Sequence, residues 1–342
     1  MREVKLSFEK LTEDAASFSR QVFGSGLFQK RQGGFVLEIA PDVDALEISF
    51  RSIGSKNRSG RRQPWFQVVD IGTIALVARK AAENGVSVIV RWPKGSGSEP
   101  SRMQKLLGGL GFRELFLTKN KEKNWQSRVE FDGYSDNGTG FRNYLPFRWF
   151  SAADFSYHED VDPYIARPSL RSSTELELRG MLEIRGFADR GAVDAFTRLI
   201  FSELAWNTIL HSERKLLTGY GLIGGQVSNH PTTDPRTGSR FSFCICDLGL
   251  GIPERISEHN GLGVLRSDDS GEGHARLLES DLLLLALDQT TTSKTHHASS
   301  ADENAGRGLY LVTEAIRTRG QIEFRSAGGK VDLVPTRSDK NQ

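Results

Sequence analysis

The feature that most constrains this chain is the junction at Asp247, where the run FSFCICD passes directly into LGLGIP. The alternating run predicts a strand over 241–247, so a carboxylate stands at the end of a strand. Gly249 and Gly251 follow it, and glycine permits unusual backbone angles and the close approach of a ligand. A carboxylate placed there can accept a hydrogen bond from an exocyclic amine, which suits adenine and disfavours the carbonyl of guanine.

A helix is predicted over 194–212, DAFTRLIFSELAWNTILHS, because its apolar residues recur at helical spacing. The stripe consists of Phe196, Leu199, Ile200, Leu204 and Ile209. Glu203 and Asn207 lie four residues apart on this helix, so their side chains emerge from one face and can converge on one small volume. Taken alone, such a pair is more typical of a solvated helix face than of a site.

A third segment, NAGRGLYLV, places Gly306 and Gly308 directly before the apolar helical run LYLVTEAIRT. This pattern predicts a glycine turn that leads into the N-terminus of a helix. The unpaired N–H groups and the dipole at a helix N-terminus favour phosphate. The chain therefore carries, in order, a polar helix face, a candidate base-reading carboxylate and a candidate phosphate loop.

These three boxes, E-x-x-x-N on a helix, D-x-G-x-G-I after a strand and G-x-G-L opening a helix, resemble the GHKL superfamily in order and context over 195–334. That superfamily includes gyrase B, MutL, the heat-shock chaperone ATPases, sensor histidine kinases and anti-sigma-factor kinases. The runs SELAWNTILHS and GRGLYLV are most similar to the anti-sigma-kinase and sensor-kinase branches. The resemblance implies a Bergerat-type α/β sandwich with a movable ATP lid, and ATP and Mg²⁺ as ligands.

The resemblance also implies a role for each matching residue. Glu203 corresponds to the catalytic carboxylate that orients or deprotonates the attacking nucleophile, and Asn207 to the residue whose side-chain oxygen holds Mg²⁺ with the triphosphate. Asp247 corresponds to the carboxylate that reads adenine. The implied ATP-binding set is Asn207, His211, Asp247, Gly249, Gly251, Ile252, Lys294, Gly306, Arg307, Gly308 and Leu309. For His211, a plain surface position is an equal alternative.

The long insertion between Pro253 and Ala305 is predicted to be the lid. Its first and last parts are polar and rich in Gly or Ser, and they flank the helix-like run LLESDLLLLALDQ. Lys294 resembles the lysine of the lid element of sensor kinases. For the neighbouring His296 and His297, a polar loop is favoured over a metal site because no third spaced ligand accompanies them.

Two departures narrow the resemblance. No H-box with a phosphoaccepting histidine precedes the Glu203 helix, so self-phosphorylation on histidine is not expected. Near the end, QIEFRSAGGKVDLV predicts a hairpin that closes the sheet, yet Lys330 and Val331 stand where many members have Gly-Thr. Adenine recognition then depends mainly on Asp247.

The first half of the chain predicts a smaller α/β domain. The alternation over 35–50 predicts two strands that pair with each other, and a helix, a strand, a helix and a strand at RELFL follow. This pattern weakly resembles the end of STAS-type domains over 35–118. The expected division is a STAS-like domain over 1–125, an interdomain connection over 126–165 that is partly packed on both sides, and the GHKL domain over 166–342, so the fold class is α/β (α+β).

The composition of the chain limits the classes of partner that we expect. The formal net charge is +2, so no field of the whole protein draws it to nucleic acid or membrane, although nucleic acid stays open as a partner. The N-terminus lacks the apolar core of a signal peptide, and no apolar run is long enough to span a bilayer, which predicts a cytoplasmic protein without membrane contact. Cys244 and Cys246 are expected to be buried thiols on one face of a strand.

Three functions remain open on these grounds. The favoured one is an ATPase, with slow hydrolysis, whose lid closure on Mg-ATP switches contacts with itself or with a protein partner. Relatives often dimerise on ATP binding, so the resemblance implies a homodimer as one outcome. The alternatives are an anti-sigma-type protein serine/threonine kinase, with the N-terminal half as an internal or vestigial substrate, and a non-catalytic ATP-binding subunit of a larger assembly.

Overall fold

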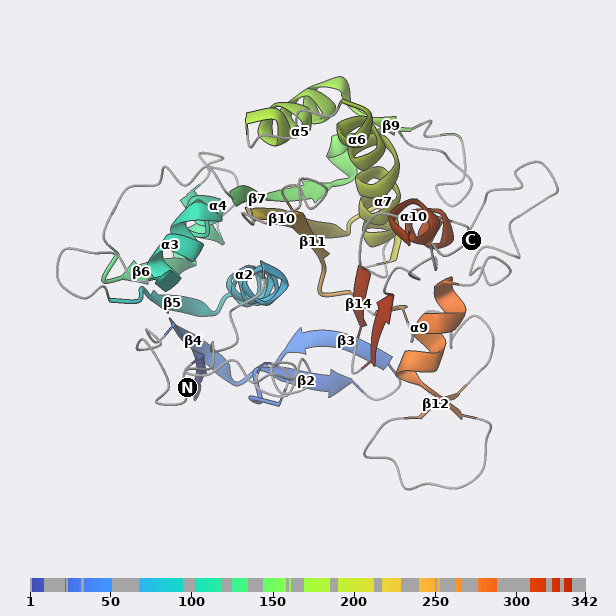
Figure 1. The fold of residues 1–342 in the computed structure, drawn as a ribbon. Helices are drawn as coiled ribbons and strands as arrows, with labels where there is room; N and C mark the ends of the chain where they lie inside the picture. Colours follow the sequence, from blue (N-terminus) through green and yellow to red (C-terminus); the bar gives the residue numbers. More distant parts are fainter. Residues whose placement is uncertain are drawn as a thin grey trace, which may run out of the picture.

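The computed structural model of the protein is mixed α/β, and its described strands form a four-stranded parallel sheet, a three-stranded antiparallel sheet and four two-stranded pairs (Figure 1). The structure describes residues 2–8, 22, 24–31, 34–50, 68–94, 102–117, 125–134, 144–157, 160, 169–184, 190–211, 217–228, 240–249, 251–252, 263–265, 276–287, 308–317, 322–326 and 329–333. Within these residues, no helix is long and apolar enough to cross a membrane.

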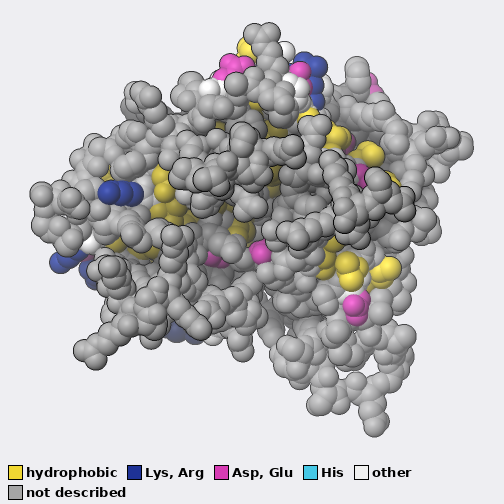
Figure 2. Space-filling model, in the orientation of Figure 1, with side chains coloured by type: hydrophobic (Ala, Val, Ile, Leu, Met, Phe, Trp, Pro, Cys, Tyr) yellow, Lys and Arg dark blue, Asp and Glu magenta, His cyan; other side chains and the backbone are white. Residues whose placement is uncertain are grey.

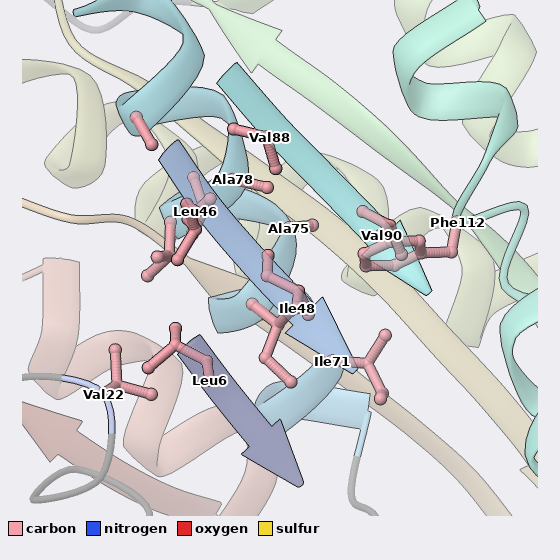
Figure 3. Close-up of a cluster of buried hydrophobic side chains, with 14 of the residues drawn as sticks. Leu6, Val22, Leu46, Ile48, Ile71, Ala75, Ala78, Val88, Val90 and Phe112 are labelled. Carbon is pink, nitrogen blue, oxygen red and sulfur yellow. The ribbon is translucent and has the colours of Figure 1, made fainter. Parts of the chain in front are cut away.

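The parallel sheet contains the strands β1 (Arg2–Phe8), β4 (Val43–Phe50), β5 (Ser87–Arg91) and β6 (Val129–Asp132), side by side in that order. The helices α2 (Val68–Glu83), α3 (Arg102–Gly109) and α4 (Glu114–Leu117) connect the later strands. Alternate residues of the strands point to the helices, as the period of two requires. Figure 3 shows part of the resulting core, which includes Leu6, Ile48 and Val90 of the strands and Ile71 and Ala75 of α2.

The opposite face of the parallel sheet is polar. Ion pairs run across it from Lys5 through Glu47 and Arg91 to Asp132, with 2.8 Å between Arg91 and Glu47 and 2.7 Å between Arg91 and Asp132. The hydrogen bond from Arg91 holds the pKa of Glu47 below its ordinary value. Parallel sheets usually have both faces covered by apolar layers, whereas the residues that the structure describes form an apolar layer on one face of this sheet.

Two expectations for this region are wrong. The strands over 35–50 do not pair with each other: β3 (Gly34–Ile39) pairs with β2 (Phe28–Arg31), while β4 lies between β1 and β5. The predicted strand RELFL is α4, because consecutive Leu115 and Phe116 are both buried and the Leu115 amide bonds to the Gly111 carbonyl in a helical turn. Local periodicity specifies that a strand exists and leaves its partner open.

The second sheet is antiparallel, with β10 (Tyr220–Ser228) between β11 (Arg240–Cys246) and β7 (Tyr144–Ser151). A Cβ atom built on Gly224 of β10 would lie 2.1 Å from Phe147 Cδ1 of β7, so only glycine lets that ring cross the strand. The segment 126–165, expected to be a connection, supplies β6 to the parallel sheet and β7 to this one. Its aromatics do pack on both sides, since Phe147 and Phe150 belong to different cores.

Helix α2 lies between the two sheets. It packs against β5 on one side and against β10 and β11 on the other, as Figure 1 shows. Twelve of its sixteen residues are buried, which agrees with the nearly continuous apolar run in its sequence. The main core therefore contains Phe147, Leu222, Cys244 and Cys246 of the second sheet together with residues of the first half.

The other face of the second sheet is covered by α5 (Ser172–Ile184), α6 (Arg190–Ala195), the π-helical turn η3 (Phe196–Phe201) and α7 (Ser202–His211). These elements, together with the short 3₁₀ helix η2 (Ala152–Asp154) and the strand pair β8 (Phe155–Ser156) and β9 (Ser169–Leu170), enclose a second core. Phe155, Phe201 and Ile209 are fully buried in it. The short helix η1 (Gln126–Arg128) precedes β6.

The last elements are the parallel pair β12 (Gly263–Leu265) and β13 (Arg276–Leu278), α9 (Glu279–Leu287), α10 (Gly308–Arg317), and the hairpin of β14 (Ile322–Ser326) and β15 (Gly329–Leu333). The predicted hairpin is confirmed, but among the described strands it forms a sheet of its own and does not close the β11–β10–β7 sheet. The helix predicted inside the insertion is α9. Figure 2 shows hydrophobic side chains at the surface near α9, where Leu284 is 50% exposed.

Candidate functional site

The helix face that carries Glu203 and Asn207 forms as predicted. Both residues lie on α7, one turn apart, and both side chains are half-buried. The turn before α7 is a π-helix, which was not predicted, and its wider turn changes which side chains reach the core. Leu199 and Ile200 of the expected apolar stripe are only half-buried, while Phe201 takes the buried position.

Asp247 lies directly after the last residue of β11, as predicted, and its side chain is exposed. Its Oδ1 accepts a hydrogen bond from the backbone N–H of Gly249, 2.7 Å away. Its Oδ2 accepts a hydrogen bond from the hydroxyl of Thr208 at 3.4 Å. Thr208 belongs to α7 and follows Asn207, so this contact places the strand end against the Glu203–Asn207 helix.

The glycine segment after Asp247 adopts the geometry that the sequence indicated. Gly251 has φ of 85°, a backbone conformation that side chains with a Cβ rarely adopt. Ile252 is half-buried and packs against the cluster of Leu282 and Ala286 on α9, against which Leu309 of α10 also packs. The loop after β11 and the first turn of α10 therefore share one apolar cluster.

Helix α10 begins at Gly308, as predicted, and packs against α7. Its first amides have no partner within the helix and form the positive end of its dipole. Gly306, Arg307 and Lys294 lie outside the described residues, as does the side chain of His211 at the end of α7. The structure thus brings together Glu203, Asn207, Asp247, Gly249, Gly251, Ile252, Gly308 and Leu309 on neighbouring elements.

The described residues contain no group of three His, Cys, Asp or Glu side chains that could hold a metal ion. The Mg²⁺ site expected at Asn207 has a different donor set, because Mg²⁺ keeps several waters and takes oxygens from a bound triphosphate. A single half-buried carboxamide on α7, which packs against α10, fits that kind of site. Asn207 therefore fits a Mg²⁺ site only together with a bound nucleotide.

The two cysteines are free and buried on the face of β11 that meets α2, as predicted. A hydrogen bond with Cys244 and burial hold the pKa of Cys246 well above its ordinary value, and the negative charges of Asp247 and Asp70 act in the same direction. Because the thiolate is the reactive form, both the raised pKa and the burial of Cys246 disfavour its reaction.

Among the residues that the structure describes, Thr208 is a site residue that the sequence motifs missed. The clue in the sequence was that Thr208 follows Asn207 on a helix whose next turn is buried. Motifs built from charged and amide residues do not include a threonine at this position. Comparison of the chain with family models, curated proteins and solved structures gave no match. The geometry described above and the sequence motifs are therefore what support a function.

Proposed function

We propose that this protein binds Mg-ATP at the meeting point of α7, the end of β11 and the start of α10, and that it is a slow ATPase of the GHKL type. The observation that carries the proposal is the contact of Asp247 with Thr208, which joins the strand end to the helix of Glu203 and Asn207. The apolar cluster of Leu282 and Ala286 supports it, because Ile252 of the loop after β11 and Leu309 of the first turn of α10 both pack against this cluster.

At the base end, Asp247 would accept a hydrogen bond from the exocyclic amine of adenine. A carboxylate is an acceptor-only group with about four lone-pair positions, and Asp247 accepts bonds from Gly249 and Thr208. These two bonds also fix the orientation of the carboxylate. Guanine presents a carbonyl at the equivalent position, and two acceptors facing each other disfavour binding.

At the phosphate end, the first amides of α10 would receive the phosphate oxygens. Asn207 would hold Mg²⁺, which supplies neutralising charge to the phosphates when it is bound. Glu203, one turn before Asn207 on the same face, would orient or deprotonate the nucleophile. The half-buried position of both side chains supports these roles, since partial exclusion of water strengthens electrostatic interactions.

The lid role of the insertion gains support from α9. This helix packs against Ile252, which lies at the base end, and against Leu309, which lies at the phosphate end. Movement of the surrounding insertion on nucleotide binding would reach both ends of the site through α9. We propose that such movement regulates contacts with a second copy or with a protein partner.

Nucleotide titration of the full chain tests the proposal. Asp247→Asn is expected to weaken ATP binding roughly tenfold to a hundredfold, because it weakens a hydrogen bond to a charged group worth about 1.5–3 kcal/mol, and to reduce the preference for ATP over GTP. Asp132→Asn, an exposed change on the other sheet, is the matched control and should leave the Kd for ATP and the Kd for GTP unchanged. Failure of the parent protein to bind ATP would overturn the proposal.

Hydrolysis is tested separately with Glu203→Ala. This variant is expected to bind ATP and to release phosphate at least about a hundredfold more slowly, the usual contribution of a general base. Equal rates in the variant and the parent would contradict the role of Glu203. Labelled γ-phosphate that appears on protein would indicate the kinase, and saturated binding without turnover would indicate the non-catalytic subunit.

A further inference from the structure

The chain at Cys246 and Asp247 is held between two helices. Successive side chains of an extended strand point in opposite directions, so Cys246 faces α2 while Asp247 faces α7. On the α2 side, Cys246 Sγ lies 4.0 Å from the Val69 carbonyl oxygen, and it is buried. On the α7 side, the Thr208 hydroxyl contacts the Asp247 carboxylate.

Gly72 sets how closely α2 and β11 approach. A Cβ atom at this position would lie 3.2 Å from Cys246 Sγ, 3.6 Å from Cys244 Sγ and 3.6 Å from Leu222 Cδ2. The contact with Cys246 is tighter than ordinary van der Waals distance, so an added methyl group requires a shift of a few tenths of an ångström. Helix α2 is fixed on its other side by β5, and β11 ends only one residue before Asp247.

The geometry points to Gly72 as a positioning residue for Asp247, through which the N-terminal half sets the base specificity of the nucleotide site. The inference rests on the proposed function at Asp247 and adds to it a role for α2, which touches no part of the nucleotide. A displacement of Cys246 moves the adjacent carboxylate relative to Thr208 and so misaligns the acceptor for the exocyclic amine. The phosphate end, held by α10, is not in this path.

Gly72→Ala tests the inference, with Gly108→Ala as the matched control. Both changes add one methyl group to a glycine within a helix, but a Cβ atom at Gly108 would meet nothing within 4 Å. We expect Gly72→Ala to raise the Kd for ATP roughly tenfold, as for one weakened hydrogen bond to a charged group, and to leave the Kd for GTP within about twofold. Gly108→Ala should change neither constant.

The double variant Gly72→Ala with Cys246→Ala separates positioning from general destabilisation. Removing the sulfur makes room for the new methyl group, so the ATP preference over GTP should return toward that of the parent. Loss of preference without rescue, or unchanged preference in a folded Gly72→Ala protein, overturns the inference. If Gly72→Ala does not fold, Cys246→Val, which crowds the same contact with α2 from the strand side, takes its place, and an unchanged ATP-to-GTP ratio in it overturns the inference.

The parent protein separates this inference from the proposal on which it rests. No ATP binding by the parent contradicts the proposed function itself. ATP binding that is weakened by Asp247→Asn but unaffected by Gly72→Ala supports the nucleotide site and contradicts the role of α2.

Discussion

Replacement of Arg79 tests how much the contacts between α2 and the second sheet contribute to the free energy of unfolding. The guanidinium carbon of Arg79 lies 3.5 Å from the ring centroid of Tyr220, 4.6 Å from that of Trp149 and 5.2 Å from that of Trp125. Its Nε donates a hydrogen bond to Glu83 at 2.8 Å, and the Tyr220 hydroxyl donates to the other oxygen of that carboxylate at 2.8 Å.

The magnitude follows from burial. Arg79 is only 7% exposed, and a desolvated guanidinium over aromatic faces contributes about 2 kcal/mol or more. The ion pair with the partly exposed Glu83 adds roughly 0.5–1 kcal/mol. Arg79→Met keeps most of the apolar stem, so the expected loss in the free energy of unfolding is about 2–3 kcal/mol.

Urea unfolding followed by tryptophan fluorescence and far-UV circular dichroism measures this loss. Arg91→Met is the control, because Arg91 makes two ion pairs but its side chain is 50% exposed, so its removal should cost clearly less stability than Arg79→Met. The reasoning is refuted if Arg79→Met costs no more than Arg91→Met. A double-mutant cycle of Tyr220→Phe and Arg79→Met isolates the coupling free energy between Arg79 and the Tyr220 hydroxyl, which both contact Glu83.

Three further predictions concern the second sheet and its helices. Phe201→Ala should lower the free energy of unfolding by about 3–5 kcal/mol in urea melts, because the ring is fully buried. Gly224→Ala should lower the melting temperature through a cost of about 1–3 kcal/mol, because the new methyl group collides with Phe147. The hydrogen bond from Arg198 lowers the pKa of Glu175, so this carboxylate stabilises the fold above about pH 4.3 and loses that effect as the pH falls through its lower folded pKa. The stability difference between the parent and Glu175→Gln should therefore shrink from pH 6 to pH 3, whereas a constant difference would contradict the assignment.

Much of the secondary structure was predictable because the spacing of apolar residues and the positions of glycines are local properties of the sequence. The helix of α2, the strand β5, the helix α9 and the hairpin β14–β15 all follow from spacing and glycines. The strand partners did not follow, since β4 pairs with β1 and β5 across long stretches of sequence. Register and partner choice depend on contacts that no local pattern specifies.

The residues of the candidate site were predictable where a motif places a particular residue type at the end of a strand or at the start of a helix. Asp247 at the end of β11, Gly251 with its positive φ and Gly308 at the start of α10 are examples. Thr208 was not, because its role comes from a contact 39 positions away in the sequence. The π-helical turn before α7 was also missed, since the apolar spacing that predicts a regular helix fits a wider turn almost as well.

The place of α2 between two sheets has a consequence for synthesis of the chain. The parallel sheet and α2 emerge from the ribosome first, whereas β10 and β11 follow much later. Roughly 160 residues separate Glu83 from Cys246, which at about 5–20 residues per second corresponds to about ten to thirty seconds. During that interval the apolar side of α2 that β10 and β11 later cover is exposed, so the nascent first half is a natural client for chaperones until the second sheet reaches it.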